Sequence, residues 1–468
     1  MKKIYRVFAI MILLSISTTA KSQNDGIALT LLPHLSYNNY YNPGIPIESN
    51  VVFGVGISNI GMSVYNSSIK YNNMYNFENN VPVAFNANKL INSLNEYDNF
   101  ISTDFSLDMF RLGLRFGNLF VDANMRVRSN SELHYSRDFL GFFINGNGNY
   151  MGYDNPANFS IGTDLNIFTE VSLGLQYTIA KKFTIGVRPK LLCGTANISI
   201  NGDNSKIYTD KNTYSMTADV NINMKAATIL NSNAQRLSEL TGLINLDSLN
   251  INELINLEEN YGFGIDFGAS YIGESFGIAA GVYDLGYINW SNSKEKQINK
   301  DNVVVNDALI DNYEDVLNME LNFNDLYQDF LENVWDNDSI YVGEDYQTTL
   351  KTRIMLQGYY ELLPMARFSA IAQMYYVKKE FHPALTLAYS GSFFKFLNIT
   401  ANYTFSKYSG NSVGAGISLN LGPLNIYAVT DNIMILTRLN ASTAELVTTY
   451  DAVNARLGLV FTFGKVTK

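Results

Sequence analysis

Cysteine, histidine and tryptophan are scarce in this chain, and each scarcity excludes a kind of chemistry. The 468 residues include one cysteine, three histidines and two tryptophans. A single cysteine, Cys193, excludes an intramolecular disulfide framework, and its place in an apolar strand pattern predicts a packed thiol. His34, His134 and His382 lie in separate segments without the spacing of metal ligands. The sequence therefore predicts no histidine metal site.

The motifs of common enzyme families are missing as well. The chain has no Gly-x-Ser-x-Gly elbow, no phosphate-binding loop and no paired cysteine motif. Asp336-Asn337-Asp338 resembles the start of a calcium loop but lacks the glycine and glutamate that should follow. We therefore predict no catalytic residue, no cofactor, no metal site and no enzymatic activity, although a serine–histidine pair on a barrel wall would escape such a search.

Charge and long apolar runs are also in short supply. Only 16% of the residues are charged, and 33 basic residues stand against 43 acidic ones, which argues against nucleic acid as a partner. No segment reaches the roughly 20 apolar residues that a transmembrane helix needs. If the protein enters a membrane, strands must carry it, because only helices and closed barrels satisfy the backbone in lipid.

The first residues have the layout of a secretory signal peptide. Three basic residues precede an apolar run over residues 7–16, and small residues follow it. We predict that residues 1–22 are removed by cleavage after Ser22, with Ala20 as the alternative position. The apolar run is too short for the other interpretation, an N-terminal anchor helix. Cleavage would leave 29 basic and 43 acidic residues, a net charge of −14.

Alternation of apolar and polar residues is what the chain has in abundance. Between residues 158 and 179 the odd positions are mostly apolar or aromatic and the even ones mostly polar, with one slip at Phe168. A period of two describes a strand with one apolar and one polar face. Strands in soluble domains usually stop after about 5–6 residues. A longer strand, in a chain that repeats this pattern and is rich in tyrosine and phenylalanine, predicts a barrel wall between lipid and water.

Short turns rich in glycine, asparagine and proline divide this pattern into fourteen strands. The predicted fold is all-β, a transmembrane antiparallel barrel of about fourteen strands, within a range of roughly 12 to 16, over residues 51–468. Alternation fails near residues 58–60, 109–110 and 283–284, where we predict bulges that reverse the faces. The strands are expected near 51–66, 105–116, 119–128, 158–179, 183–200, 261–272, 275–290, 346–360, 366–378, 383–391, 397–405, 411–421, 424–432 and 452–463.

Long connections are expected at the extracellular end of the barrel. Helical spacing of apolar residues near 237–244 and 326–335 predicts amphipathic helices at the barrel mouth, so the loops are partly helical. Residues 214–224 alternate like a strand, but strand parity assigns them to an extracellular extension rather than to the membrane. The acidic residues 291–345 fit either a solvated loop or a patch for cations or a basic partner. The long loops are 67–104, 129–157, 201–260, 291–345 and 433–451.

The alternation of inward and outward positions predicts that charged residues of both signs face the lumen of the barrel. Two interpretations remain open, a salt-bridged network that fills the barrel and holds a plug, or a mixed-charge conduit or binding pocket. The long strand should bring Asp164 and Glu170 opposite its basic neighbours. The candidate lumen-lining residues are Arg126, Arg128, Asp164, Glu170, Arg188, Lys190, Asp266, Lys351 and Arg353, with Arg111, Arg115, Asp122 and Arg456 on the same face.

Residues 23–50 form a separate segment ahead of the first strand. Residues 26–35 are largely apolar, tyrosines follow, and Asn42, Pro43 and Gly44 then predict a tight turn. This composition is suited to a plug or hatch inside the lumen. A disordered leader is the alternative, but the hydrophobicity of the segment argues against it.

Several short motifs together resemble an uncharacterised family of outer-membrane proteins, related in design to the FadL-type and PorV-type fourteen-stranded barrels. They are the turn Asn42-Pro43-Gly44 and residues 170–175, 262–271, 284–290 and 427–432. The resemblance implies a monomeric barrel in outer-membrane lipid, with its N-terminal segment in the lumen, and no established substrate. For the two named types it implies hydrophobic-ligand passage and service to a protein secretion machine, respectively.

Three hypotheses for the function follow. The first is a FadL-like channel or transporter for small hydrophobic or amphipathic compounds in the bacterial outer membrane, with a lumenal hatch and an apolar pocket under the loops. The alternative is a non-transporting barrel that serves as a scaffold or binding component for secretion-system proteins or surface attachment, with a blocked lumen and structured loops. A secreted soluble β-protein is the third, and it would lack a continuous apolar band about 25 Å tall.

Overall fold

The computed structural model describes residues 26–69, 71–78, 81–97, 99–228, 259–291, 293–305, 341–363, 365–377, 380–394, 396–406, 411–433 and 452–465. The predicted signal peptide and the predicted helices near 237–244 and 326–335 lie outside the described residues. Within the described ranges, no helix is long and apolar enough to cross a membrane.

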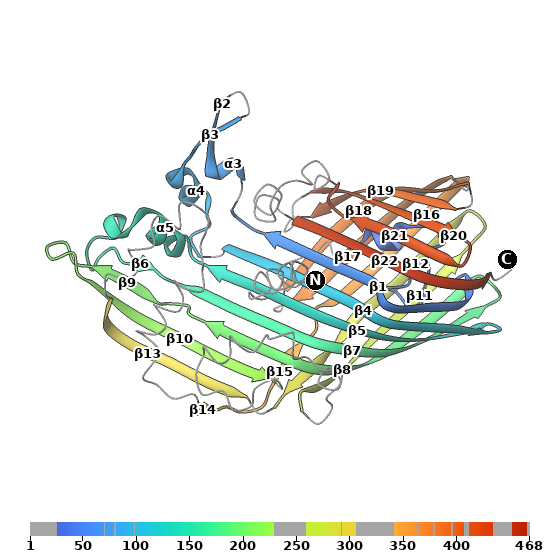
Figure 1. Cartoon of the computed structure of the whole chain (residues 1–468), viewed down its shortest axis with the longest axis horizontal. Helices are drawn as coiled ribbons and strands as arrows, with labels where there is room; N and C mark the ends of the chain where they lie inside the picture. Colours follow the sequence, from blue (N-terminus) through green and yellow to red (C-terminus); the bar gives the residue numbers. More distant parts are fainter. Residues whose placement is uncertain are drawn as a thin grey trace.

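Fourteen antiparallel strands of the described chain close into a barrel, which confirms the predicted fold (Figure 1). Each strand pairs with the next, and the last pairs back to the first, from Ser49 opposite Lys465 to Tyr65 opposite Ala452. The strands of the ring are β1 (Ser49–Asn66), β4 (Asn99–Phe116), β5 (Leu119–Tyr135), β7 (Ile161–Ile179), β8 (Phe183–Asn201), β11 (Tyr261–Ile272), β12 (Phe276–Trp290), β16 (Thr352–Leu363), β17 (Ala366–Val377), β18 (Glu380–Phe393), β19 (Leu397–Ser406), β20 (Ser412–Leu421), β21 (Leu424–Thr430) and β22 (Ala452–Lys465).

Six short turns lie at one end of this barrel, here called the turn end. The other end, the loop end, has the long connections and the two short ones between β17 and β18 and between β19 and β20. The turn end is at the right of Figure 1, beside the C-terminus. Two predicted strand ends need correction, because β4 begins at Asn99 and β5 continues to Tyr135. Residues 129–132 are polar on both faces, so the alternation stops there although the hydrogen-bonded ladder continues toward the loop end. The loops predicted at 67–104 and 129–157 are correspondingly shorter.

The three predicted irregularities are real bulges. The register shifts between Val55 and Asn59 on β1, between Asp108 and Phe110 on β4, and on β12 opposite the Ile265–Phe267 step. A further shift leaves Thr195 of β8 as an extra residue opposite the step from Ile167 to Phe168 on the long strand. Each extra residue turns the following side chains to the other face of the wall.

Apolar side chains cover the outer surface of the ring. On β19 the buried Asn398, Thr400, Asn402 and Thr404 alternate with exposed residues such as Ile399 and Phe405. The pattern reverses that of a soluble protein, whose strands bury the apolar face. It therefore argues against the hypothesis of a secreted soluble β-protein.

A sheet with its own apolar core extends from the loop end. Strand β10 (Met216–Thr228) pairs with the last residues of β8 and with β13 (Lys294–Val305), outside the ring, as expected for residues 214–224. The inner face of β10 packs against helix α5 (Arg137–Asn145) through Phe139, Ile222, Met224 and their neighbours. The other elements at this end are α3 (Tyr71–Met74), β2 (Tyr75–Glu78), β3 (Val81–Phe85), α4 (Ala87–Ser93), η1 (Asn147–Asn149), β6 (Ala157–Asn158), β9 (Lys206–Thr209), β14 (Tyr341–Val342) and β15 (Tyr346–Thr349).

Candidate functional site: the occupied lumen

Charged side chains from six neighbouring strands, β4, β5, β7, β8, β11 and β12, meet in the middle of the lumen. Five are acidic and five are basic, so the network is balanced in charge. Nearly all of them are buried, which is costly for a charge unless partners compensate it. The members among the described residues are Asp108, Arg111, Asp122, Arg126, Arg128, Glu170, Arg188, Lys190, Asp266 and Asp284.

Lys190 is the centre of this network. Its Nζ lies 2.8 Å from Asp266 Oδ1, 2.7 Å from Asp284 Oδ1 and 3.7 Å from Glu170 Oε2, and its side chain is fully buried. An ammonium group has three donors, and here three carboxylates surround it. Neither Lys190 nor any of its acidic partners could lose its charge alone without leaving the others uncompensated.

Arginines connect the same carboxylates to the walls on either side. Arg126 Nε lies 2.5 Å from Asp108 Oδ1, and Arg128 contacts Asp284 at 2.8 Å and Glu170 at 3.1 Å. Guanidinium groups suit this role because their planar forks bind two carboxylates at fixed geometry. The network therefore links the inner faces of six neighbouring strands on one side of the lumen.

Six of the predicted lumen-lining residues come together in this network, namely Arg126, Arg128, Glu170, Arg188, Lys190 and Asp266. The other three lie elsewhere: Asp164 accepts a hydrogen bond from Ser199, Lys351 binds Asp104 at 2.6 Å, and Arg353 stacks on Tyr41 and Tyr375. The expectation that Asp164 faces the basic cluster is wrong. It lies six residues beyond Glu170, about 20 Å farther along an extended strand.

Two members of the network were missed because they sit at bulges. Asp108 directly precedes the register shift on β4. Asp284, with a φ of 61°, is one of two residues on β12 that lie opposite the single residue Asp266. A strict alternation would assign such residues to the wrong face. The failure of the alternation at 109–110 and 283–284 is the sequence signal that could have shown that these two carboxylates face the lumen.

Residues 26–48 lie inside the barrel beside this network. They include the short helix α2 (Ala28–Leu31) and a series of turns, and Ile27, Leu29 and Leu35 are at most 1% exposed. These side chains pack against inward-facing apolar residues of the ring, among them Val52, Met355, Ile371, Val429 and Val460. The segment is thus a hydrophobic core enclosed by the barrel, and we call it the plug.

Tyrosines of the plug lie against arginines of the wall. The guanidinium of Arg111 lies 4.4 Å from the centre of the Tyr37 ring, Arg126 lies 4.0 Å from Tyr40, and Arg353 lies 4.0 Å from Tyr41. Cation–π contacts of this kind contribute roughly 2 kcal/mol when desolvated. The plug and the charged network therefore stabilise each other.

The Asn42-Pro43-Gly44 turn rests on wall glycines near the turn end. A methyl group on Gly186 would overlap the Pro43 carbonyl, and one on Gly268 would overlap the Asn42 side chain. Gln176 Nε2 donates to the carbonyls of Pro43 and Ile45, both at 2.7 Å, and the Ser270 hydroxyl donates to the Gly44 carbonyl. Only glycine lets the turn approach the wall this closely.

A buried carboxylate holds the other end of the plug. Asp431 accepts hydrogen bonds from the backbone N–H groups of Ile27 at 3.0 Å and Ala28 at 2.9 Å, and Asn454 Nδ2 donates to it at 3.0 Å. These N–H groups precede and begin α2, where a helix leaves its donors unsatisfied. The sequence predicts motifs at residues 42–44 and 427–432 but does not predict that they act together. Residues 42–44 fix the plug at one end, and Asp431 of the second motif binds it at the other.

A cluster of apolar residues lies on the loop side of the charged network. Trp290, Phe168, Leu192 and Ile288 form a fully buried cluster, and the Trp290 indole donates to the Thr348 hydroxyl. Among the described residues, a group of three or more histidine, cysteine or carboxylate side chains that could hold a metal ion is not found. Cys193 is buried, as predicted.

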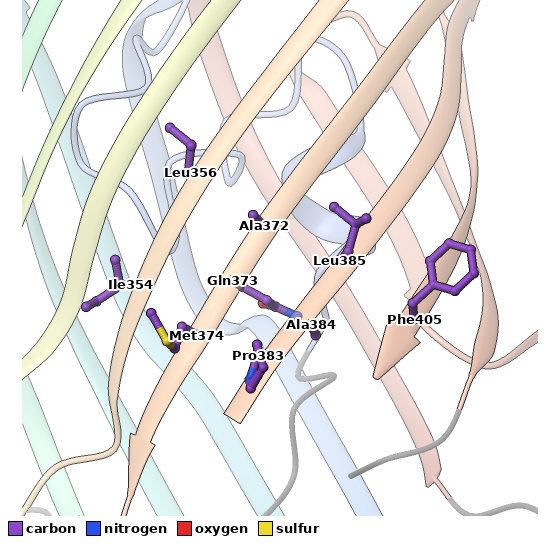
Figure 2. A pocket seen from close by; sticks show the side chains of 9 residues that line it. All are labelled: Ile354, Leu356, Ala372, Gln373, Met374, Pro383, Ala384, Leu385 and Phe405. Carbon is purple, nitrogen blue, oxygen red and sulfur yellow. The ribbon is translucent and has the colours of Figure 1, made fainter. Parts of the chain in front are cut away.

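Two apolar hollows of about 490 and 700 Å³ lie on the outer surface of the described wall. The smaller one forms where the small residues Ala372 and Pro383 are flanked by Leu356, Leu385 and Phe405 (Figure 2). The larger one covers the outer side of the strands that cradle the plug turn, including Gly186 and Gly268. The first hypothesis expected a pocket under the loops; these hollows instead lie on the outer face, while the plug and the Trp290 cluster fill much of the space inside.

The fold and the site together define a closed fourteen-stranded barrel with an N-terminal plug. The chain belongs to the family of unknown function DUF5723, which matches residues 43–431. A search of curated proteins finds no match.

Solved structures that resemble the chain are outer-membrane barrels with very different sequences. The toluene transporter TbuX of Ralstonia pickettii aligns with a TM-score of 0.40 at 11% identity, over 92% of this chain and 94% of its own. The Pseudomonas putida toluene transporter TodX gives 0.41 at 7%, over 96% of both chains. A Pseudomonas aeruginosa FadL homologue gives 0.44 at 8%, over 96% of this chain and 99% of its own. The barrel assignment rests on the strand pairing of this chain, and these alignments say nothing about what it carries.

Proposed function

We propose that the protein is an outer-membrane channel for small hydrophobic or amphipathic compounds, and that the plug is its hatch. One observation carries the proposal: the plug covers apolar residues on five strands of the inner wall opposite the charged network, together called the apolar strip. They are Val52, Met355, Ile371, Val429 and Val460. Removal of the plug would expose these residues to the lumen.

The same strip favours hydrophobic cargo over ions. Uncovering a buried leucine or isoleucine costs roughly 1.5–3 kcal/mol, so the open state is unfavourable on its own. A ligand shifts the equilibrium between the plugged and the open barrel only by its preference for one of them. A hydrophobic compound that covers the strip stabilises the open barrel, whereas an ion does not. The charged network contributes no net charge that would attract ions of one sign.

The alternative is a non-transporting barrel that acts as a scaffold in secretion or surface attachment. The observation that favours it is the structured extension at the loop end, with a core that includes Phe139, Phe142, Ile222 and Met224. A channel has no evident need for such a module. Both functions could share one chain, but only transport depends on movement of the plug.

Uptake of a hydrophobic dye tests the proposal. Cells that produce the full-length protein should take up 1-N-phenylnaphthylamine slowly, and cells that produce a variant without residues 26–48 should take it up at least tenfold faster. A matched control deletes residues 75–85 of the β2–β3 hairpin, which pairs outside the ring, and should behave as the full-length protein.

Heat-modifiable mobility on gels establishes that each variant is a folded barrel. If the deletion of the plug does not fold, Asp431→Ala provides a second variant, because it leaves the N–H groups of Ile27 and Ala28 without their acceptor. Equal dye uptake by control cells and by cells with a folded, plug-deleted barrel would contradict the proposed transport.

A further inference from the structure

The tip of the extension carries two tyrosines that are mostly exposed. The connection between β9 and β10 forms the left end of the molecule in Figure 1, at the far side from the short turns. Tyr214 in this connection is 64% exposed, and Tyr153 in the adjoining loop is 62% exposed. An exposed aromatic ring in water is unfavourable, so two at one tip call for an explanation.

The two loops that carry these rings are held together. Gly152 N donates to the Thr209 carbonyl at 2.8 Å, and Lys211 Nζ lies 3.2 Å from Asp154 Oδ1. The Tyr153 ring stacks on Tyr208 with centres 5.7 Å apart and an angle of 29° between the planes. Tyr208 thus supports one face of the Tyr153 ring.

Tyr214 is displayed by a turn with a strained backbone. Asp210 Oδ1 accepts the N–H groups of Asn212 and Thr213, both at 2.8 Å, and these backbone hydrogen bonds lower the pKa of Asp210. The N–H of Tyr214 donates to the Asp210 carbonyl, and its φ is 59°. Bulky residues rarely adopt this left-handed conformation, and such strain concentrates at functional sites. A glycine or asparagine would adopt this positive φ at lower cost. The tyrosine at position 214 therefore suggests a role for its aromatic ring.

The side chains around the rings are polar and well suited to hydroxyl groups. Asn155, Asn212, Asp154 and Lys211 are exposed, and they supply both donors and acceptors. A pyranose ring has an apolar C–H face, which packs on an aromatic ring, and a rim of hydroxyls, which needs such polar partners. A protein partner would instead need roughly 800 Å² with an apolar centre. At this tip each exposed ring stands among amide and charged groups.

We propose that the tip formed by residues 152–155 and 208–215 binds the sugar rings of a polysaccharide outside the cell. Tyr153 and Tyr214 are the stacking platforms, and Asp154, Asn155 and Asn212 hydrogen-bond to the hydroxyls. The site is independent of the proposed transport, because it lies on the extension and uses no residue of the lumen.

Binding of the purified full-length barrel in detergent to immobilised laminarin, xylan, mannan and dextran tests this site. The intact protein should bind at least one of the four. Tyr153→Ala and Tyr214→Gly should each weaken that binding at least tenfold, and the double variant should abolish it. Tyr214→Gly removes the ring but suits the positive φ, so a loss of binding cannot be attributed to unfolding of the turn. Tyr97→Ala, which removes a ring with 66% exposure in another loop, is the control and should bind as the intact protein does.

Two results would overturn the proposal. One is a lack of binding to all four polysaccharides by the intact protein. The other is binding by the double variant that equals that of the Tyr97→Ala control. Neither result depends on dye uptake, so the failure of this site and the failure of the channel proposal are distinguishable.

Discussion

Replacing Gly268 with alanine is expected to displace the Asn42-Pro43-Gly44 turn and loosen the whole plug. The added methyl group would overlap the Asn42 side-chain oxygen and lie 2.7 Å from the Gly44 nitrogen. Forcing a group into a packed core costs about 1–3 kcal/mol. Here the turn can escape only by leaving Gln176 and Ser270 without their carbonyl partners. Limited proteolysis of the folded barrel should cut within residues 26–48 at least tenfold faster than in the unmodified protein.

The matched control for this variant is Gly358→Ala. Gly358 also lies in a wall strand, but the nearest atoms to an added methyl group are 3.8 and 3.9 Å away, which is ordinary contact. This substitution should leave the cleavage rate unchanged. Equal protection of the plug in the two alanine variants would show that the glycine cradle does not hold it.

The second large effect is expected at Lys190. Lys190→Met keeps most of the side-chain volume but leaves Glu170, Asp266 and Asp284 without their shared ammonium group. Removing one partner of a buried ion pair costs about 3–5 kcal/mol. Denaturant unfolding, followed by tryptophan fluorescence in detergent, should report a loss of this size. Adding Asp266→Asn should recover part of it, because it removes one uncompensated charge.

Lys225→Met provides the comparison for Lys190→Met. Lys225 pairs with Glu295 at 2.8 Å, a distance like those around Lys190, but its side chain is 51% exposed. Exposed ion pairs contribute about 0–1 kcal/mol, so this variant should unfold nearly as the unmodified protein does. A loss at Lys190 no larger than the loss at Lys225 would contradict the view that the network is dry and tightly coupled.

The wall of the barrel was predictable from the sequence because its physics is local. A period of two, interrupted by tight turns, is enough to count the strands, and the three breaks predicted as bulges are bulges. The prediction failed at residues 129–135 of β5, where residues 129–132 are polar on both faces although Ser131 and Glu132 are buried beside the extension. Beyond the apolar band the alternation has no cause, although the backbone continues to pair.

The site was less predictable because it depends on distances around the barrel. Parity showed that Asp164 and Glu170 face inward, but not that only Glu170 reaches the level of Lys190. Asp108 and Asp284 were hidden by the same bulges that turn them into the lumen. Asp431 lies about 400 residues from Ile27 and Ala28, whose backbone N–H groups donate hydrogen bonds to it. No local sequence pattern could predict this pairing.

The apolar character of residues 26–35 predicts a plug, and the contacts in the structure show where in the barrel this plug lies. Hydrophobicity alone cannot say which wall strands receive a segment. The two motifs at residues 42–44 and 427–432 become intelligible only together, since one is the turn of the plug that rests on glycines and the other carries its buried acceptor, Asp431.

Ionic current through single barrels in a planar bilayer tests most directly the claim that residues 26–48 close the lumen. The full-length protein should pass almost no current, and the folded protein without residues 26–48 should pass a steady current. A synthetic peptide of residues 26–48, added on the side of the turn end, should block that current again. A full-length protein that conducts as well as the deletion variant, or a folded deletion variant that stays silent, would contradict the account.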